Sequence, residues 1–198
     1  MNEIINIFKK NKGYARMIEL KMARIHTRSV SQAIKEGLIE KIKPGLYKLV
    51  DYPWDEHGSF ADVCKSNGRA VICLLSAADY HQLTTFNPSE IYVAVPNNTD
   101  KFVLKYPPIK VYYFGDSYYQ PGIGTFETKS GLVRIYNKEK TIGDIFRYMN
   151  KLGEDIAVET LKEYLGDRKS RNIPKLLEYA EICGVKKKLE PMVKAILA

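Results

Sequence analysis

The sequence has few cysteines and histidines, and this scarcity excludes several kinds of site. Cys64, Cys73 and Cys183 are odd in number and show no C-x-x-C spacing, so neither a disulfide framework nor a zinc site is indicated. We expect them to be buried thiols. His57 has no cysteine or second histidine nearby in the sequence and is interpreted as a loop residue. The sequence therefore predicts no bound metal and no cofactor.

Long apolar runs are also missing. No stretch approaches the roughly 18 to 20 apolar residues of a transmembrane helix. The first residues, MNEIINIFKKNK, lack the charged, apolar and small-residue regions of a secretory signal. We expect a cytoplasmic protein with no membrane partner. With 198 residues, 45% of them hydrophobic, the chain can form one or two packed domains.

Complete catalytic motifs are absent as well. The stretch from Ser76 to His81, SAADYH, brings a serine, an acid and a histidine together without the pattern G-x-S-x-G. We expect Ser76 and Asp79 to cap a helix that follows a strand at 70–75, which places His81 beyond the reach of Ser76 Oγ. Gly122-Ile123-Gly124 lacks the lysine and serine of a phosphate-binding loop. The sequence predicts that the chain is not an enzyme.

Positive charge is concentrated at the N-terminal end. Residues 1–48 hold 11 Lys or Arg against 4 Asp or Glu, a net charge of +7, whereas the rest of the chain has a net charge of +1. Solubility alone does not require this segregation. A basic membrane anchor would instead carry bulky apolar residues along one long helix. The distribution predicts that the N-terminal part binds a polyanion.

The segment from Thr27 to Lys48, TRSVSQAIKEGLIEKIKPGLYK, predicts a short helix, a glycine stop and a basic hairpin. One side of the helix is small or apolar and can face a core. It comprises Val30, Ala33, Ile34 and Gly37. The opposite side carries three long polar side chains, Arg28, Gln32 and Lys35.

This polar row suits the major groove of DNA. Arginine can fork onto guanine, glutamine can fork onto adenine, and lysine can reach guanine or a phosphate. We predict that Arg28, Gln32 and Lys35 read bases, with Ser29 and Ser31 beside them. The start of the helix is open by one turn, because either Thr27 or Ser29 can cap it. Gly37 predicts its end.

A hairpin is predicted after the helix, with strands at 39–43 and 46–50 around the turn dipeptide Pro44-Gly45. Its apolar contacts are expected from Ile42, Tyr47 and Leu49. Three of its lysines are predicted to share the outer side and, with two residues from earlier in the chain, to hold DNA phosphates. These five residues are Lys10, Arg16, Lys41, Lys43 and Lys48.

Residues 2–10 and 15–22 predict two earlier helices, the second with Ile18 and Met22 on its core face. Three helices and a hairpin in this order predict a winged helix-turn-helix domain at 1–50. Use of the same fold for protein interaction is the main alternative, and a helix with a simply solvated charged face is another.

Residues 51–59, DYPWDEHGS, predict a linker. Residues 60–198 predict a mixed α/β domain, with a mostly antiparallel or mixed sheet at about 70–136 and a C-terminal helical bundle at about 138–198. The first of these helices has an apolar stripe formed by Ile142, Ile145, Phe146 and Met149. The predicted fold class is α+β.

Five blocks follow one another in a specific order along nearly the whole chain. They are Gly13-Tyr14-Ala15-Arg16, the run from Gly37 to Tyr47, Cys73-Leu74-Leu75-Ser76-Ala77, His81-Gln82-Leu83-Thr84-Thr85 with Pro88, and Glu139-Lys140-Thr141-Ile142-Gly143-Asp144. In this order the chain resembles the AbiEi family of antitoxins from type IV toxin-antitoxin systems, which act in abortive infection. Where that family usually has S-A-L and H-G-L-T, this chain has Ser76-Ala77-Ala78 and His81-Gln82-Leu83-Thr84.

This resemblance implies a protein with two activities. The N-terminal domain would bind inverted repeats in double-stranded operator DNA and repress its own operon. The C-terminal domain would counteract a cognate nucleotidyltransferase toxin, in a phage resistance system, without a stable complex. The resemblance supplies no catalytic residue.

Two other functions stay open. One is a ligand-responsive transcriptional repressor. The other is an enzyme that processes nucleic acid, for which the separated Asp100, Asp116 and Glu127 form no recognisable metal motif.

Overall fold

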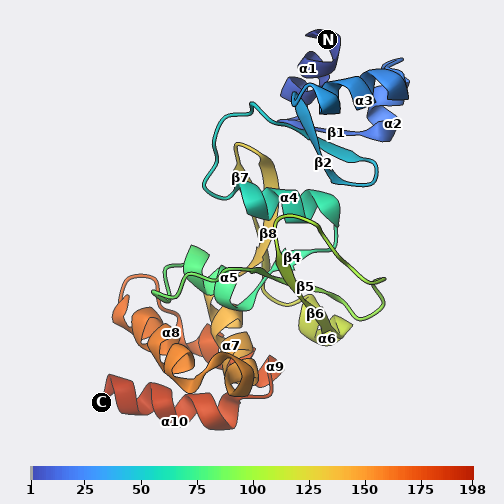
Figure 1. Ribbon diagram of the computed structural model, residues 1–198. Coiled ribbons are helices and arrows are strands. Elements are labelled where there is room, and N and C mark those ends of the chain that lie inside the picture. Colours follow the sequence, from blue (N-terminus) through green and yellow to red (C-terminus); the bar gives the residue numbers. More distant parts are fainter. Residues whose placement is uncertain (1) are drawn as a thin grey trace. The chain divides into compact units, whose positions relative to one another are not determined.

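The computed structural model describes residues 2–198 and has a mixed α+β fold (Figure 1). The described residues form ten helices, a three-stranded sheet and a five-stranded sheet. Contacts divide the chain into two compact units. The first unit comprises the described residues up to Gly68, together with Val103–Pro107 and Glu127–Val133. The second unit comprises Arg69–Phe102, Pro108–Phe126 and Arg134–Ala198.

The first unit begins with four helices and three short strands. Its elements are α1 (Asn2–Lys10), β1 (Tyr14–Arg16), α2 (Met17–Met22), α3 (Thr27–Lys35), β2 (Ile39–Lys43), β3 (Leu46–Leu49) and α4 (Gly58–Ser66). The sheet has the order β1-β3-β2 and is antiparallel throughout, with Tyr14 opposite Lys48 and Ile39 opposite Leu49. A bulge interrupts β2 between Lys41 and Lys43.

Both faces of this sheet carry buried apolar side chains. One face joins the core of the three preceding helices, where Phe8, Leu20 and Val30 pack with Tyr47 and Leu49. The other face holds a separate cluster of Tyr14, Ile42 and Leu46. Successive side chains of a strand point to opposite faces, so the β2–β3 hairpin contributes residues to both clusters.

The helix predicted at 15–22 differs from the observed structure. Residues 14–16 form strand β1, which leaves only six residues for α2. Leu20 is its buried residue, whereas the side chains of Ile18 and Met22 are 65% and 80% exposed. The predicted core face was wrong because the strand, through Tyr14 and Ala15, takes over the core contacts expected from the helix.

Helix α3 matches its prediction more closely. Val30 and Ala33 are buried, but Ile34 is 38% exposed, so the buried side is narrower than expected. His26 occupies the N-cap position without a side-chain cap, in place of the predicted Thr27 or Ser29.

The predicted end of α3 at Gly37 is confirmed. Its N–H bonds to the carbonyl of Ile34 at 3.1 Å, and the N–H of Leu38 bonds to that of Ala33 at 3.0 Å. This pair of bonds is a Schellman motif, which needs a left-handed residue, and Gly37 has φ of 70°.

The segment predicted as a linker at 51–59 is held in place within the first unit. Tyr52 donates its hydroxyl hydrogen to the carbonyl of Lys129 at 3.2 Å. The Asp55 carboxylate accepts from the N–H of Ser130 at 2.9 Å and from that of His57 at 3.1 Å. Helix α4, which the sequence placed in the C-terminal domain, belongs to the first unit.

The remaining elements are β4 (Val71–Ile72), α5 (Leu74–Tyr80), β5 (Ile91–Pro96), β6 (Ile109–Phe114), α6 (Asp116–Tyr119), β7 (Ile123–Thr128), β8 (Gly131–Tyr136), α7 (Lys138–Leu152), α8 (Glu154–Gly166), α9 (Ile173–Ile182) and α10 (Lys186–Leu197). The five-stranded sheet has the order β6-β5-β4-β8-β7. Helices α7 to α10, orange to red in Figure 1, contact one another.

The five-stranded sheet is mixed. Strand β4 runs antiparallel to β5, but β5 and β6 are parallel, and so are β4 and β8. Of the two sheet types that the sequence left open, mostly antiparallel or mixed, the five-stranded sheet is the mixed one. A parallel pair requires a long connection, and residues 97–108 between β5 and β6 provide one.

Candidate nucleic-acid interface

The predicted base-reading residues lie together on the outer side of α3. All five are exposed, namely Arg28, Ser29, Ser31, Gln32 and Lys35. Their direction is set by Val30 and Ala33, which are buried on the opposite side of the same helix. Within the described residues, neither Arg28 nor Lys35 forms an ion pair. Both cations are thus available to an external anion.

Part of this row borders a hollow of about 370 Å³ beside α1. Arg28, Ser29 and Gln32 line it from α3, and Glu3 and Ile4 line it from α1. Gln32 also donates its side-chain N–H to Oε1 of Glu36 at 2.8 Å. The row is therefore bounded by one carboxylate at Glu3 and a second at Glu36.

Sequence reasoning missed two basic residues next to α3. Lys21, in the last turn of α2, and Arg24, in the four-residue connection to α3, are both exposed. Helix α2 and its connection lie directly before α3, and in the predicted helix-turn-helix the helix before the recognition helix crosses the DNA backbone. The sequence signal for them is their position just before α3. The helix predicted at 15–22 was judged by the spacing of its apolar residues, and that criterion does not record basic residues.

The basic residues predicted to hold phosphates fall into two groups. Lys10 at the end of α1 and Lys41 on β2 are exposed, and Lys43 is half-buried beside the turn. Lys48 is different, because its Nζ lies 3.0 Å from Oδ2 of Asp62 on α4. Its side chain is only 19% exposed, and that of Asp62 is 5% exposed.

The prediction that Lys48 shares the outer side with Lys41 was therefore wrong. Lys48 lies opposite Tyr14 in the sheet register, and the two side chains share one face. The hydroxyl of Tyr14 donates to Oδ1 of Asp62 at 2.6 Å. Burial, followed by the nearby Asp62 carboxylate, raises the pKa of the Tyr14 hydroxyl well above its usual value. Asp62 is thus held on both oxygens.

Arg16 also contributes to this side of the first unit. Its guanidinium donates to the carbonyl of Lys65 at 3.0 Å, although the side chain is exposed. The ammonium of Lys65 lies 5.0 Å from the ring centroid of Tyr14, and partial burial lowers the pKa of Lys65. Arg16 and Lys48 therefore stabilise the packing of α4 in addition to carrying charge.

The second unit contains a fully buried ion pair on α7. Lys140 Nζ lies 2.5 Å from Oδ1 of Asp144, and both side chains are completely buried. The Tyr118 hydroxyl donates to the same oxygen, and the thiol of Cys183 lies 3.5 Å from it. The Lys140 ammonium also lies over the rings of Tyr118 and Tyr136, at 3.7 Å and 4.4 Å from their centroids.

The charged groups of this cluster are closed off from solvent, because the side chains of Lys140 and Asp144 have no exposed surface. Burial raises the pKa of Asp144, against the effect of Lys140. Gly122 packs on Lys140, where a Cβ at Gly122 would come within 2.7 Å of the lysine Cβ. Lys140 and Asp144 lie on the side of α7 opposite its apolar stripe. In most helices that polar side faces water, so the sequence periodicity did not predict the burial of this pair.

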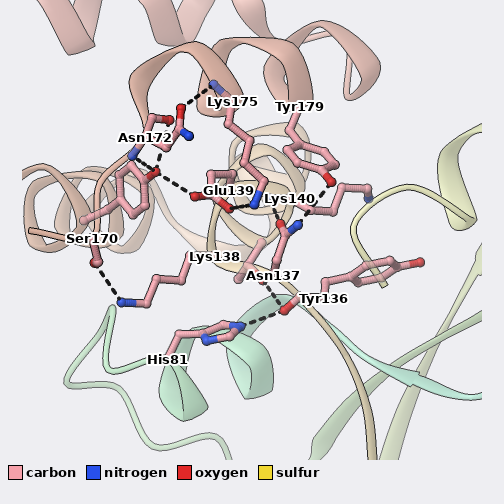
Figure 2. Close-up of polar contacts among 12 residues, drawn as sticks. His81, Tyr136, Asn137, Lys138, Glu139, Lys140, Ser170, Asn172, Lys175 and Tyr179 are labelled. Atoms are coloured by element: carbon pink, nitrogen blue, oxygen red, sulfur yellow. Dashed lines mark hydrogen bonds and ion pairs between the residues drawn. The ribbon is translucent and has the colours of Figure 1, made fainter. Parts of the chain in front are cut away.

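Figure 2 shows a second set of polar contacts at the starts of α7 and α9. Oδ1 of Asn137 accepts from the N–H of Lys140 at 2.9 Å and caps α7. The Glu139 carboxylate accepts from the Tyr164 hydroxyl at 2.9 Å and lies 3.3 Å from Nζ of Lys175. These contacts hold the helices of the second unit together.

The serine and histidine of the SAADYH stretch have separate partners. The buried Oγ of Ser76 accepts from the N–H of Tyr92 at 2.9 Å. His81 lies 2.7 Å from the carbonyl of Tyr136, so its Nε2 is the donor (Figure 2). The predicted capping role of Ser76 was wrong, because α5 begins at Leu74, with Cys73 at the N-cap.

Comparison of the chain with models of known protein families gave no match, and neither did a search of curated proteins. Within the described residues, no group of three or more His, Cys, Asp and Glu side chains could hold a metal ion. None of the helices in the described part of the chain is long and apolar enough to cross a membrane.

Proposed function

We propose that the first unit is a winged helix-turn-helix module that binds double-stranded DNA. The order helix, strand, helix, helix, strand, strand, with the sheet order β1-β3-β2, supports this proposal. A connection of four residues joins α2 to α3, as is typical of a helix-turn-helix. The recognition helix is α3, and the β2–β3 hairpin is the wing.

The single observation that carries the proposal is the outward row on α3. Arg28, Gln32 and Lys35 are exposed together, while Val30 and Ala33 fix the helix from beneath. These three side chains have the donors and acceptors needed to read base edges in the major groove. Ser29 and Ser31 lie beside them and supply shorter contacts.

Phosphate contacts are assigned to basic residues around the row that are exposed or half-buried and form no ion pair within the described residues. The assignment keeps Lys10, Lys41 and Lys43, and adds Lys21 and Arg24. Lys48 is removed, because it is paired with Asp62, and Arg16 has a smaller part, because it also bonds to the carbonyl of Lys65. Phosphate contacts supply affinity and orientation, and base contacts supply sequence preference.

We further propose that the chain is a cytoplasmic antitoxin of a type IV toxin-antitoxin system. In this proposal it represses its own operon through inverted repeats and counteracts a nucleotidyltransferase toxin without a stable complex. The resemblance to the AbiEi family supports it. The second unit, with α7 to α10 as its helical bundle, would carry the antitoxin activity.

The DNA half is tested with the full-length protein and a labelled duplex from the region upstream of its own reading frame. Arg28→Ala, Gln32→Ala and Lys35→Ala are each expected to cost about 1 to 3 kcal/mol of binding free energy. Lys187→Ala, at an exposed position on α10, is the matched control and should leave affinity unchanged. Unchanged affinity of all three α3 variants would show that this surface does not bind the duplex.

The antitoxin half is tested by co-expression with the product of the neighbouring reading frame, which the proposal expects to be a nucleotidyltransferase. The triple change at Arg28, Gln32 and Lys35 to alanine is expected to abolish repression of a promoter reporter while preserving rescue of growth. Such a separation assigns the two activities to different surfaces. Failure of the unaltered protein to rescue growth contradicts the antitoxin proposal but not DNA binding.

A further inference from the structure

Glu36 places a carboxylate at the end of α3, next to the row of Arg28, Gln32 and Lys35. Glu36 is the only acidic residue between Arg24 and Ile39. It directly follows α3, and its side chain is exposed. Within the described residues it forms no ion pair with a lysine or arginine.

Simple electrostatics disfavours a negative charge at this position. The carboxyl end of a helix carries partial negative charge, which repels a carboxylate. A carboxylate also repels the phosphates that the neighbouring basic residues would attract. A surface that served only to attract DNA would gain affinity from a neutral or basic residue in place of Glu36.

Glu36 makes one specific contact, and the contact is to the predicted adenine reader. Its Oε1 accepts from Nε2 of Gln32 at 2.8 Å, one helical turn earlier. This bond fixes which end of the Gln32 amide is the nitrogen. The second N–H of Gln32 and its Oε1 stay available, and this pair matches N7 and the N6 amino group of adenine.

We propose that Glu36 is a positioning and specificity residue of the DNA-binding surface. It holds the Gln32 amide in the orientation that reads adenine. Its carboxylate also disfavours guanine at the adjacent base pair, because the guanine edge presents only the acceptors N7 and O6 in the major groove. The N4 amino group of cytosine, in contrast, can donate a hydrogen bond to the carboxylate. This inference rests on the proposed DNA binding through α3.

The test uses the full-length protein and a library of randomised duplexes about 20 base pairs long, enough for one recognition helix and its wing. The preferred duplex is selected with the unaltered protein. Its affinity, and that of every single-base variant, is then measured by fluorescence anisotropy at one salt concentration. The variants are Gln32→Ala, Glu36→Ala and Glu36→Gln. The control is Glu178→Ala, which removes an exposed carboxylate on α9.

Glu36→Ala is expected to reduce the preference for adenine over the other bases about 10-fold at the position that Gln32→Ala also affects. It should also reduce the discrimination against guanine at one neighbouring base pair. It is also expected to strengthen binding to random duplexes, because a negative charge is lost. Glu36→Gln keeps an acceptor for Gln32, so it should keep the adenine preference and lose the discrimination against guanine. Glu178→Ala should change neither property.

The inference is overturned if Glu36→Ala changes the affinity for every duplex by the same factor, since Glu36 would then act only as a charge. A preferred duplex whose base preferences do not respond to Gln32→Ala also overturns it, while DNA binding itself stands. If the unaltered protein selects no duplex at all, the inference and the proposed function fail together.

Discussion

The role of each basic residue in the first unit depends on which face of its element it occupies. Lys41 and Lys48 are both on the predicted wing and are similar in sequence context, yet Lys41 is exposed and Lys48 bonds to a buried aspartate. Charge counting cannot separate them. The strand register separates them: Lys41 lies opposite Tyr47 and Lys48 lies opposite Glu40, and successive residues of a strand point to opposite faces.

A pair of lysine substitutions tests this difference. Lys48→Met should lower the free energy of unfolding by about 1 to 3 kcal/mol, because it leaves the Asp62 carboxylate poorly compensated. Lys41→Met should alter stability by less than about 0.5 kcal/mol, as expected for an exposed residue. If Lys41 holds a phosphate, its loss should also flatten the salt dependence of DNA affinity by about 0.9 in the log–log slope. Urea unfolding and anisotropy titrations measure the two effects, and equal stability of both variants would contradict the assignment.

His81 predicts a pH dependence of stability in the second unit. Burial lowers the pKa of His81, and the positive charge of Lys138 lowers it further. The hydrogen bond from His81 to the Tyr136 carbonyl and the negative charge of Glu139 raise this pKa, but the net shift is downward. The folded protein therefore binds this proton less readily than the unfolded chain. The stability from neutral His81 is fully present above the unfolded pKa of about 6.5 and is lost as the pH falls through the folded pKa.

Thermal unfolding between about pH 7.5 and pH 5 measures this effect, since histidine titrates in that range. The unaltered protein should lose stability toward acid pH. His81→Gln, which keeps a donor for the Tyr136 carbonyl but cannot be protonated, should show a flatter profile. A profile that is identical in the two proteins would mean that His81 does not titrate on unfolding.

The buried pair of Lys140 and Asp144 predicts strong coupling. Lys140→Met or Asp144→Asn alone leaves one charge uncompensated inside the second unit and should cost about 3 to 5 kcal/mol of stability. The double variant removes both charges and should cost clearly less than the sum of the two. Urea unfolding of all four proteins gives the coupling energy, and additive effects would mean that the two side chains act independently.

At the scale of elements, the sequence predicted α3 and its hairpin well and α2 poorly. Helix α3 has a regular apolar side and a glycine end, two local signals that act within a few residues. The segment 15–22 has apolar residues at helical spacing, but residues 14–16 pair with β3 instead. Pairing of Tyr14 with Lys48, in a distant strand, leaves no local signal, so periodicity alone placed Ile18 and Met22 incorrectly.

The end of α3 gives a prediction about one glycine. Gly37→Ala should destabilise the protein by about 1 to 2 kcal/mol, because an alanine is strained in the left-handed conformation. No atom lies within 4 Å of a Cβ at Gly37, so the cost comes from the backbone alone. Gly68→Ala is the control, since Gly68 has equal space and no positive φ. Thermal unfolding that gives the same loss for both variants would contradict this explanation.

At the scale of the whole molecule, the compact units do not follow the predicted division at 1–50, 51–59 and 60–198. The first unit takes in α4 and two short segments from later in the chain, Val103–Pro107 and Glu127–Val133. Composition marked 51–59 as a linker because it is rich in turn-forming residues. It could not reveal that Tyr52 and Asp55 are held by residues 129 and 130.

Fragments of the first unit test this division. Residues 1–50 lack α4 and leave Tyr14, Ile42 and Leu46 uncovered on one face of the sheet. Residues 1–68 should therefore unfold at a higher temperature and more cooperatively, because they keep the bonds from Tyr14 and Lys48 to Asp62. Circular dichroism with temperature measures both fragments, and equal midpoints would mean that α4 adds nothing to the N-terminal domain.

The sequence by itself determined the features that depend on neighbouring residues. These are the concentration of charge in residues 1–48, the two sides of α3, its end at Gly37 and the turn of the hairpin. Tertiary structure alone decided the parallel strand pairs, the pairing of Lys48 with Asp62, and the burial of Lys140 with Asp144. Those features depend on contacts between residues far apart in the chain, which local periodicity and composition do not record.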